Sequence, residues 1–204
     1  MIYLIITSSI ANRHGIRDAE YRERTYKESI AQTLSVLPMG IKPIIVENNG
    51  QRSTFLDDFG VDVVYTENNF KRFPNKGGNE LADIKHVIHA YDMKDDDIVI
   101  KLTGRYKLMS DMFLQNVIDE QEFYDAFVKF FNVCTLEFAP GKDSVLGLYA
   151  LRVKYLRNFE YTFDGRQSIE CEFAVYTSSL DRCKACTTLN LECCFADDHR
   201  TLRV

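Results

Sequence analysis

The sequence predicts an α/β protein with one central, mostly parallel mixed sheet and helices on both faces. Two observations lead to this fold class. Short apolar runs of strand length alternate with segments of helical spacing through the first half of the chain. The first run, Ile2 to Thr7, is continuously apolar, as expected of a strand that is buried on both sides in a parallel sheet. Further runs follow at residues 42–47, 61–66 and 98–102.

Helical segments separate these expected strands. Residues 17–37 gain apolar residues at helical spacing late in the segment, which ends before a proline and a glycine. Residues 55–59 form a short helical patch. Leu81 and Ile84 begin the apolar face of a helix expected over residues 79–91. Right-handed crossovers through such helices bring successive strands into parallel alignment.

The second half of the chain is less regular. Helices are expected at residues 111–118, 153–159 and 168–178, and strands at residues 126–136 and 144–151, with Pro140-Gly141 between the two strands. The sequence has neither an internal repeat nor a Pro-rich linker, so residues 1–204 are predicted to form a single domain.

Composition limits the classes of function. The chain of 204 residues is 46% hydrophobic and 27% charged, with a formal net charge of -5. Such an acidic balance argues against nucleic acid as a partner, because nucleic-acid binding relies on basic surface. The apolar opening is too short for a signal peptide or a membrane span. We therefore expect a cytoplasmic protein without a membrane span.

The six cysteines are expected to be free thiols, since disulfides are rare in cytosolic proteins of this size. A structural zinc site is the alternative. Cys183, Cys186, Cys193 and His199 are of the residue types that bind zinc, but the spacing after the first pair is irregular.

Two corners of the chain are suited to phosphate. The fourth strand ends in Lys101-Leu-Thr-Gly-Arg-Tyr106, where Gly104 allows close backbone approach and Arg105 offers a planar fork of donors. A second basic, Gly-rich corner, Asn75-Lys-Gly-Gly-Asn-Glu80, opens a helix. Ligands of open α/β sheets lie outside the carboxyl ends of strands. Together the corners favour a nucleotide or nucleotide-sugar site; the alternative is that the first is an ordinary surface turn.

This order of elements resembles the GT-A fold of nucleotide-sugar glycosyltransferases, and the motif at residues 101–106 is similar to one in small bacterial and large-DNA-virus members. The resemblance implies transfer of a sugar from a nucleoside-diphosphate donor, UDP-linked by expectation, to a carbohydrate or glycoprotein acceptor. Residues 1–106 would bind the nucleotide and residues 107–204 the acceptor. A viral member would act in the host cytoplasm. The implied nucleotide contacts are Thr7, Ser8 and Glu47 for the base, and Asn75, Lys76, Gly77, Asn79, Thr103 and Gly104 for ribose and phosphates.

The resemblance also implies Mn²⁺ or Mg²⁺, but the Asp-x-Asp motif of the family is missing from the fourth strand. Arg105 is therefore expected to neutralise part of the diphosphate. Asp198 and His199 resemble the late acid/His segment that supplies a metal ligand in some of these enzymes; an exposed C-terminal tail is the alternative. The acidic residues 95–97 precede the fourth strand and lie at the wrong end of the sheet.

Removal of a proton from the acceptor, needed for inversion, calls for a carboxylate. Glu172 is the first choice and Glu170 the second, because both begin a helix in the half where the family places acceptor chemistry. Alternatively, both simply favour the helix dipole. Two other functions remain open: a nucleotidyltransferase, and a non-catalytic nucleotide- or zinc-binding module.

Overall fold

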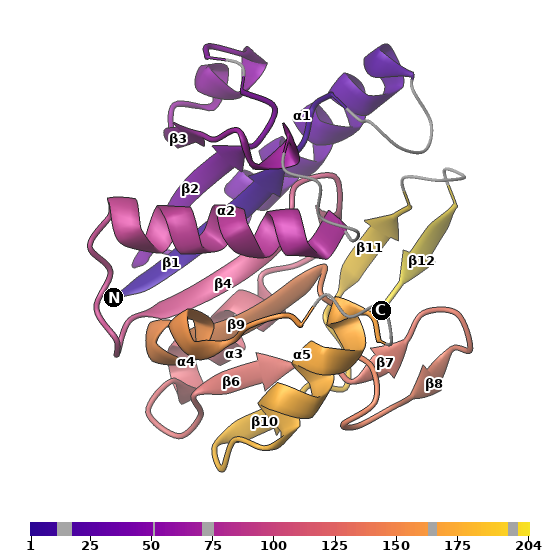
Figure 1. Ribbon diagram of the computed structural model, residues 1–204. Helices are drawn as coiled ribbons and strands as arrows, with labels where there is room; N and C mark the ends of the chain where they lie inside the picture. The colour runs from indigo at the N-terminus through magenta and orange to yellow at the C-terminus, as the bar shows by residue number, and fades with distance from the viewer. Residues whose placement is uncertain (12–17, 51, 71–75, 163–166, 196–199) are drawn as a thin grey trace.

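The computed structural model describes residues 1–11, 18–50, 52–70, 76–162, 167–195 and 200–204. A seven-stranded sheet with the order β10-β6-β9-β4-β1-β2-β3 forms its centre (Figure 1). The strands are β1 (Ile2–Ser8), β2 (Ile41–Glu47), β3 (Asp62–Tyr65), β4 (Ile98–Thr103), β6 (Ala126–Val128), β9 (Leu148–Arg152) and β10 (Cys183–Ala185). The α/β fold class predicted from the sequence is confirmed.

The pairing within this sheet is mostly parallel. Strand β1 pairs in parallel with β2 on one side and with β4 on the other, and β2 pairs in parallel with β3. Strand β9 runs antiparallel to both β4 and β6, while β10 is parallel to β6. The second half of the chain thus extends the sheet that the first half begins.

Helices cover both faces of the sheet. Helices α1 (Ala19–Ser35) and α3 (Met112–Glu120) lie on one face; α2 (Lys76–Ala90), α4 (Val153–Asn158) and α5 (Ile169–Ser178) lie on the other (Figure 1). Alternation along β1 explains the two cores: Ile2, Leu4 and Ile6 pack toward α1, whereas Tyr3 and Ile5 pack toward α2. The side chains that β4 directs toward α2 therefore reach the same layer as α5.

The first half follows the sequence expectation with small shifts. Helix α2 begins at Lys76 rather than Asn79, so the Gly-rich corner is its first turn. In its described residues, the crossover from β2 to β3 contains the 3₁₀ helix η1 (Phe55–Phe59), closed by Gly60 in the left-handed conformation; a second 3₁₀ helix, η2 (Asn68–Phe70), follows β3. Asp18 caps α1 by accepting a hydrogen bond from the Tyr21 N–H at 2.9 Å.

The expected strand over residues 126–136 is wrong in its length. It divides into β6 and a hairpin of β7 (Phe131–Asn132) and β8 (Glu137–Phe138), because the chain turns after Asn132 and Leu136 adopts a positive φ of 60°. The side-chain oxygen of Asn132 accepts hydrogen bonds from the N–H groups of residues 134 and 135, and these two bonds fix the turn. Likewise the strand expected from Ser144 begins only at Leu148.

A second, three-stranded antiparallel sheet was not expected. It contains β5 (Lys107–Leu108), β11 (Leu191–Cys194) and β12 (Thr201–Arg203), in the order β12-β11-β5. Because β5 directly follows the corner after β4, this sheet places the end of the chain beside that corner.

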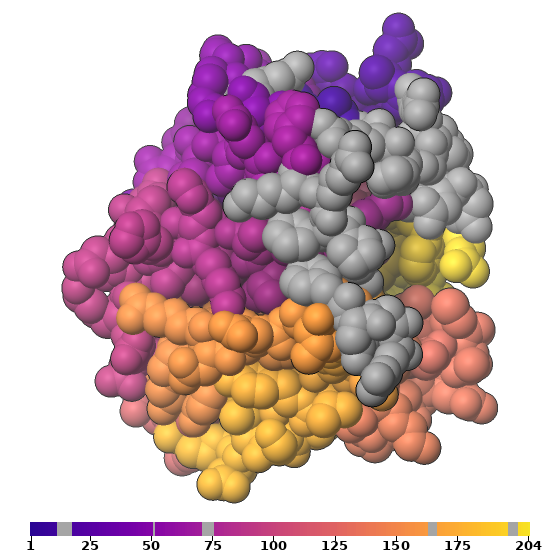
Figure 2. Space-filling view, viewed as in Figure 1, coloured from indigo at the N-terminus to yellow at the C-terminus, as the bar shows by residue number. Residues whose placement is uncertain are grey.

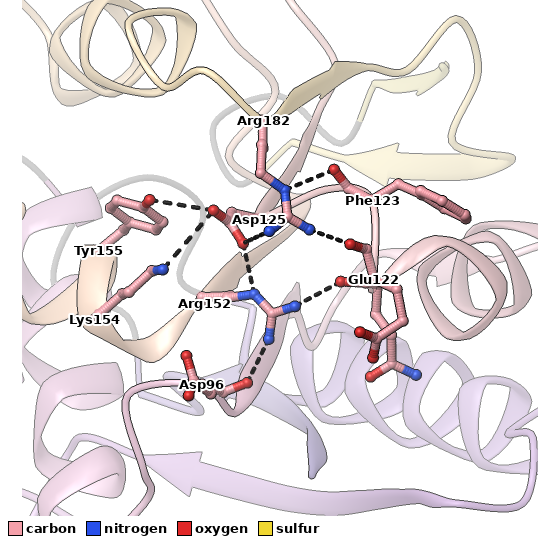
Figure 3. Close-up of polar contacts among 9 residues, drawn as sticks. Asp96, Glu122, Phe123, Asp125, Arg152, Lys154, Tyr155 and Arg182 are labelled. Carbon is pink, nitrogen blue, oxygen red and sulfur yellow. Dashed lines mark hydrogen bonds and ion pairs between the residues drawn. The ribbon is translucent and has the colours of Figure 1, made fainter.

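A dense ionic cluster lies at the end of the main sheet where the parallel strands begin (Figure 3). Asp125 is 5% exposed, and its carboxylate accepts from Arg152 Nε at 2.6 Å and from the Tyr155 hydroxyl at 3.2 Å. Lys154 and Arg182 lie 3.9 and 3.6 Å from it. Burial opposes the charge of Asp125, but the hydrogen bond from Arg152 and the two further cations hold its pKa below the ordinary value. The cluster joins β6, β9, α4 and the start of β10.

The acidic residues at this edge lie far from the carboxyl ends of the parallel strands. Asp97 is buried rather than solvated, and its carboxylate accepts from the N-terminal ammonium at 2.6 Å and from the Lys94 N–H at 2.7 Å. Asp95 pairs with exposed Arg157 at 2.8 Å. These contacts serve the start of β4, consistent with the expectation that this turn lies at the wrong end of the sheet for a metal site.

Candidate active site

The parallel strands β1, β2 and β4 end together and define one edge of the sheet. Thr7 lies opposite Val46 of β2 and Thr103 of β4, and Ser8 lies opposite Glu47. The sequence-based nucleotide contacts in these strands are thus brought side by side. Lys76, Gly77 and Asn79 reach the same region on the first turn of α2, which packs against β1 and β2. Asn75 lies outside the described residues.

Glu47 is fully buried and organises the loop after β1. Its carboxylate accepts from the Ile10 N–H at 3.1 Å and from the Asn49 N–H at 3.1 Å, and the Asn49 carboxamide binds it as well. A carboxylate held by backbone donors is a strong, charge-assisted acceptor. Glu47 therefore fixes the backbone at the ends of β1 and β2, where the base of a nucleotide was expected.

Buried polar atoms without a hydrogen-bond partner concentrate at this edge. Among the described residues, four buried side-chain oxygens make no hydrogen bond within the protein; three of them, Ser8 Oγ, Asn48 Oδ1 and Asn79 Oδ1, lie at this edge, and the fourth belongs to a threonine of α1. They come from the end of β1, the residue after β2 and the first turn of α2. Because an unsatisfied buried polar group costs roughly 1–3 kcal/mol, a concentration of three calls for an explanation. A bound polar ligand, or water in its place, supplies one.

Asp83 joins α2 to the ends of β2 and β3. It is 0% exposed, and its carboxylate accepts from Asn48 Nδ2 at 2.8 Å, Thr66 Oγ1 at 2.7 Å and Asn68 Nδ2 at 2.7 Å. Burial raises the pKa of Asp83 to about 6, although the three donors oppose that shift. The cluster sets the position of α2 over the sheet, and with it the position of the Gly-rich first turn.

A raised pKa makes the stability contribution of Asp83 depend on pH. The folded state binds a proton more tightly than the unfolded state, so the contribution is full below about pH 4 and is lost as pH rises through about 6. Asp83→Asn removes the charge, and rotation of the Asn48 amide lets its unpartnered Oδ1 accept from the new amide. We expect the variant to be up to about 3 kcal/mol more stable than the wild type at pH 7, with little difference near pH 4.

Chemical denaturation at several pH values measures this difference. Asp83→Ala serves as the contrasting variant, because it leaves three buried donors without an acceptor and should be less stable than Asp83→Asn throughout the range. A difference between wild type and Asp83→Asn that stays constant from pH 4 to pH 7 would contradict the raised pKa.

A buried ion pair lies at the end of β4. Lys101 is 2% exposed, and its ammonium donates to Thr103 Oγ1 at 2.6 Å, to the Leu146 carbonyl at 2.7 Å and to the carboxylate of Glu80. Burial lowers the pKa of Lys101, and the attraction of Glu80 opposes that shift. Glu80 directly follows the first turn of α2, and a cavity of about 20 Å³ adjoins the pair, beside Gly77 and Tyr149.

The corner after β4 is packed against the protein. The N–H of Gly104 donates to the Thr7 carbonyl at 2.9 Å, and a Cβ at this position would meet that oxygen at 2.9 Å and the Tyr26 ring at 3.0 Å. Only glycine allows this approach between β4, β1 and α1. The close backbone approach expected of Gly104 is thus made to the protein itself.

Arg105 follows at the same corner and is half-buried. Its Nε donates to the Cys194 carbonyl of β11 at 2.9 Å, and its guanidinium lies over the Tyr106 ring at 5.1 Å. The Tyr26 hydroxyl also bonds to it. The side chain therefore joins β4 to the second sheet, and its permanent charge is held at the carboxyl edge.

The two candidate bases on α5 occupy different surroundings. The Glu172 carboxylate accepts from the Thr162 N–H at 3.1 Å and its hydroxyl at 2.6 Å. It lines an open hollow of about 760 Å³, together with Glu160 and Tyr176. Glu170 is half-buried in the first turn and close enough to Lys101 for its charge to raise the pKa of that ammonium. Glu170 is thus the nearer of the two to the sheet edge.

Metal ligands are not gathered within the described residues. Asp198 and His199 lie outside them, and no group of three His, Cys, Asp or Glu side chains in the described part could hold a metal ion. All six cysteines are free. Burial raises the pKa of Cys183 and Cys186 to about 11, which favours the thiol over the thiolate that zinc needs. His199, the fourth ligand of the zinc alternative, is outside the described residues.

Sequence reasoning placed Glu80 and Lys101 only at the ends of the two motifs without a role of their own, and it did not name Asp83. The signal for Lys101 was a charged residue inside the apolar run 98–102, and the signal for Asp83 was a carboxylate beside Ile84 on the buried side of a helix. Charges seldom sit in such positions unless they are paired. Their pairing, however, joins residues that only the tertiary structure brings together.

Comparison with known proteins defines the fold. No protein-family model and no curated protein sequence matches the chain. Among solved structures, the inositol-1-phosphate CTP transferase from T. maritima superimposes with a TM-score of 0.57 at 14% identity, covering 90% of this chain and 84% of that one. Glucosyl-3-phosphoglycerate synthase from Mycobacterium tuberculosis, in complex with Mn²⁺, UDP and glucosyl-3-phosphoglycerate, gives 0.53 at 13% identity, with 90% and 68% covered.

A third similar structure is CMP:2-keto-3-deoxy-manno-octonic acid synthetase in complex with CTP, with a TM-score of 0.51 at 13% identity over 79% of this chain and 80% of that one. The chain thus has the GT-A-like α/β fold that nucleotidyltransferases and glycosyltransferases share. Identities this low establish the fold alone. The comparison gives no support to the viral relationship considered from the sequence. No helix in the described ranges has the length and apolar character needed to cross a membrane.

Proposed function

We propose that this protein is a glycosyltransferase that binds a nucleoside-diphosphate sugar, UDP-linked, at the carboxyl ends of β1, β2 and β4, and transfers the sugar to a carbohydrate or glycoprotein acceptor. The observation that carries the proposal is the concentration of buried, unpartnered polar atoms at this edge, on Ser8, Asn48 and Asn79. The same end of the sheet also carries Arg105, which follows β4, and the first turn of α2, and both are suited to phosphate.

The proposed division of the site follows the order of the strands. The base lies over the ends of β1 and β2, near Thr7, Ser8 and Glu47. Ribose and diphosphate lie between the first turn of α2 and the corner after β4. Residues 107–204 bind the acceptor, with the hollow beside Glu172 as its entrance. In Figure 2 the surface of α2 adjoins the orange surface of residues around α4, so the two halves meet on this face.

Transfer requires a stabilised leaving group and a base. The chain offers Arg105, Lys76 and the N–H groups of the first turn of α2 for the negative charge that develops on the departing nucleoside diphosphate. For an inverting reaction, Glu172 or Glu170 removes the proton of the acceptor hydroxyl as that oxygen attacks the anomeric carbon. The sugar passes to the acceptor oxygen, and the bond to the diphosphate breaks.

A divalent ion, Mn²⁺ or Mg²⁺, would add positive charge at the diphosphate. The described residues at this edge do not fit one well: the carboxylate nearest the end of β4, Glu80, is paired with Lys101. Asp198 and His199 stay the proposed ligands. The mechanism above therefore assigns no step to a metal.

A nucleotidyltransferase is the second candidate, because the same fold occurs in CTP-dependent transferases. Such an enzyme would release pyrophosphate from a nucleoside triphosphate, whereas a glycosyltransferase releases a nucleoside diphosphate. A nucleotidyltransferase is expected to carry a Gly-rich run directly after its first strand. Here residues 7–12 contain no glycine, and the segment before α1 has a single one, Gly15.

A product screen tests the proposal. The purified protein is titrated calorimetrically with UDP, GDP, CDP and CTP, and then incubated with a panel of nucleotide sugars, with and without Mn²⁺. We expect UDP to bind and at least one UDP-sugar to release UDP slowly by hydrolysis. Pyrophosphate release from CTP in the presence of sugar phosphates would favour the nucleotidyltransferase instead. Binding of no nucleotide would contradict both functions.

A further inference from the structure

We propose that Glu80 binds hydroxyl groups of the transferred sugar and that Lys101 is the positioning residue that fixes it. The inference rests on the proposed function, since it names the group that selects the donor sugar within that site. Neither residue was among the sequence-based candidates, and it is their contacts in the structure that indicate a role.

Lys101 itself is closed to a ligand. Its ammonium is 2% exposed, and its three hydrogen bonds are used by Thr103, Leu146 and Glu80. A buried ion pair contributes little net stability, because desolvation of both charges offsets their attraction. A buried ion pair can instead serve to hold one of its two groups in a fixed position. Here the group that is held, and that still reaches solvent, is the Glu80 carboxylate.

Glu80 has the exposure and geometry of a binding group. Its side chain is 24% exposed, and the same oxygen, Oε2, is bound by Lys101 and lies 3.5 Å from the Thr103 hydroxyl. Both contacts of the carboxylate therefore fall on one oxygen, which leaves the other as an acceptor. Glu80 directly follows the first turn of α2, and it lines a small cavity together with Ile169 and Phe173 of α5, the helix that α2 contacts.

The chemistry of the carboxylate selects hydroxyl groups. A second negative charge repels a diphosphate, whereas the O–H groups of a sugar donate to a carboxylate. Position then separates the transferred sugar from the ribose. The unpartnered atoms of Ser8 and Asn48 lie at β1 and β2, while the Glu80–Lys101 pair lies at β4 and shares its cavity with Tyr149 of the next strand, β9. A donor whose base lies over β1 and β2 extends its sugar toward β9.

The test removes both charges together. Glu80→Gln/Lys101→Met keeps the approximate volume of the pair and leaves neither charge without its partner, so it should be destabilised less than Lys101→Met alone. Calorimetry with UDP and with the hydrolysed UDP-sugar then compares this variant with the wild type. We expect unchanged UDP affinity and a tenfold to hundredfold loss, roughly, of affinity for the UDP-sugar. Glu120→Gln/Lys184→Met, which neutralises the partly buried pair between α3 and β10, is the matched control and should change neither affinity.

Three outcomes overturn the inference. If the folded double variant binds the UDP-sugar as tightly as the wild type does, the pair has only a structural role. Loss of UDP affinity together with UDP-sugar affinity assigns Glu80 to the ribose or diphosphate. If the wild-type protein binds no nucleotide, the proposed function is wrong and the inference fails with it. This result differs from the other two, in which the wild type still binds UDP. If the double variant is unfolded, Glu80→Gln alone gives the same comparison, because its amide oxygen still accepts from Lys101.

Discussion

Glu170→Gln and Glu172→Gln are expected to separate donor binding from sugar transfer. Whichever residue is the general base, its amide variant should bind UDP with wild-type affinity and lose about 10²–10⁴-fold in the rate of transfer, because the amide cannot take the acceptor proton. The measurement is single-turnover transfer to an acceptor found by glycan screening, with UDP affinity measured on the same preparation.

The contacts of Glu170 and Glu172 give reasons to expect either of them as the base. Glu172 was preferred from the sequence, and its carboxylate holds Thr162 at the rim of the hollow. Glu170 lies nearer Lys101 and the sheet edge. Glu122→Gln, which changes an exposed carboxylate outside the lining of the hollow, is the control and should transfer at nearly the wild-type rate. If Glu170→Gln is the slow variant, the choice of Glu172 is wrong; if both variants keep near-wild-type transfer, neither is the base.

The fold was predictable where local pattern and tertiary structure agree. The continuous apolar run of β1 predicted a strand buried on both faces, and the helices between the strands fixed their parallel direction. The hairpin of β7 and β8 was missed because its turn depends on Asn132 and on a left-handed Leu136, a conformation that leucine rarely adopts. Strands as short as β5 carry too little periodicity to be recognised.

The candidate site was predictable to the level of the sheet edge. Gly104 and Arg105 follow β4 directly, so their location came with the location of that strand. The partners of these residues could not be foreseen, because Arg105 contacts β11, which the sequence analysis did not anticipate. The pairs Lys101–Glu80 and Asp83–Asn48 likewise depend on how α2 sits on the sheet. The order of the strands defines where the candidate site lies, whereas side-chain packing determines which of its residues can contact a ligand.

Arg105→Ala is expected to weaken UDP binding by about one to two orders of magnitude. A charge-assisted hydrogen bond to a partly desolvated phosphate contributes roughly 1.5–3 kcal/mol, which corresponds to that loss of affinity. Arg105→Lys keeps the positive charge but loses the planar fork, so its affinity should fall between those of the wild type and Arg105→Ala. Calorimetric titration with UDP measures all three proteins.

The structure requires a stability control for this experiment, since Arg105 also bonds to the Cys194 carbonyl and packs on Tyr106. Melting temperatures recorded without ligand separate loss of these contacts from loss of phosphate binding. Lys107→Ala is the matched variant: it removes a cation from the same corner, but Lys107 pairs with Glu28 on α1, so UDP affinity should stay unchanged. A folded Arg105→Ala protein with wild-type UDP affinity would limit Arg105 to joining the two sheets. The charge that stabilises the diphosphate would then have to come from elsewhere, with the first turn of α2 as the next place to test.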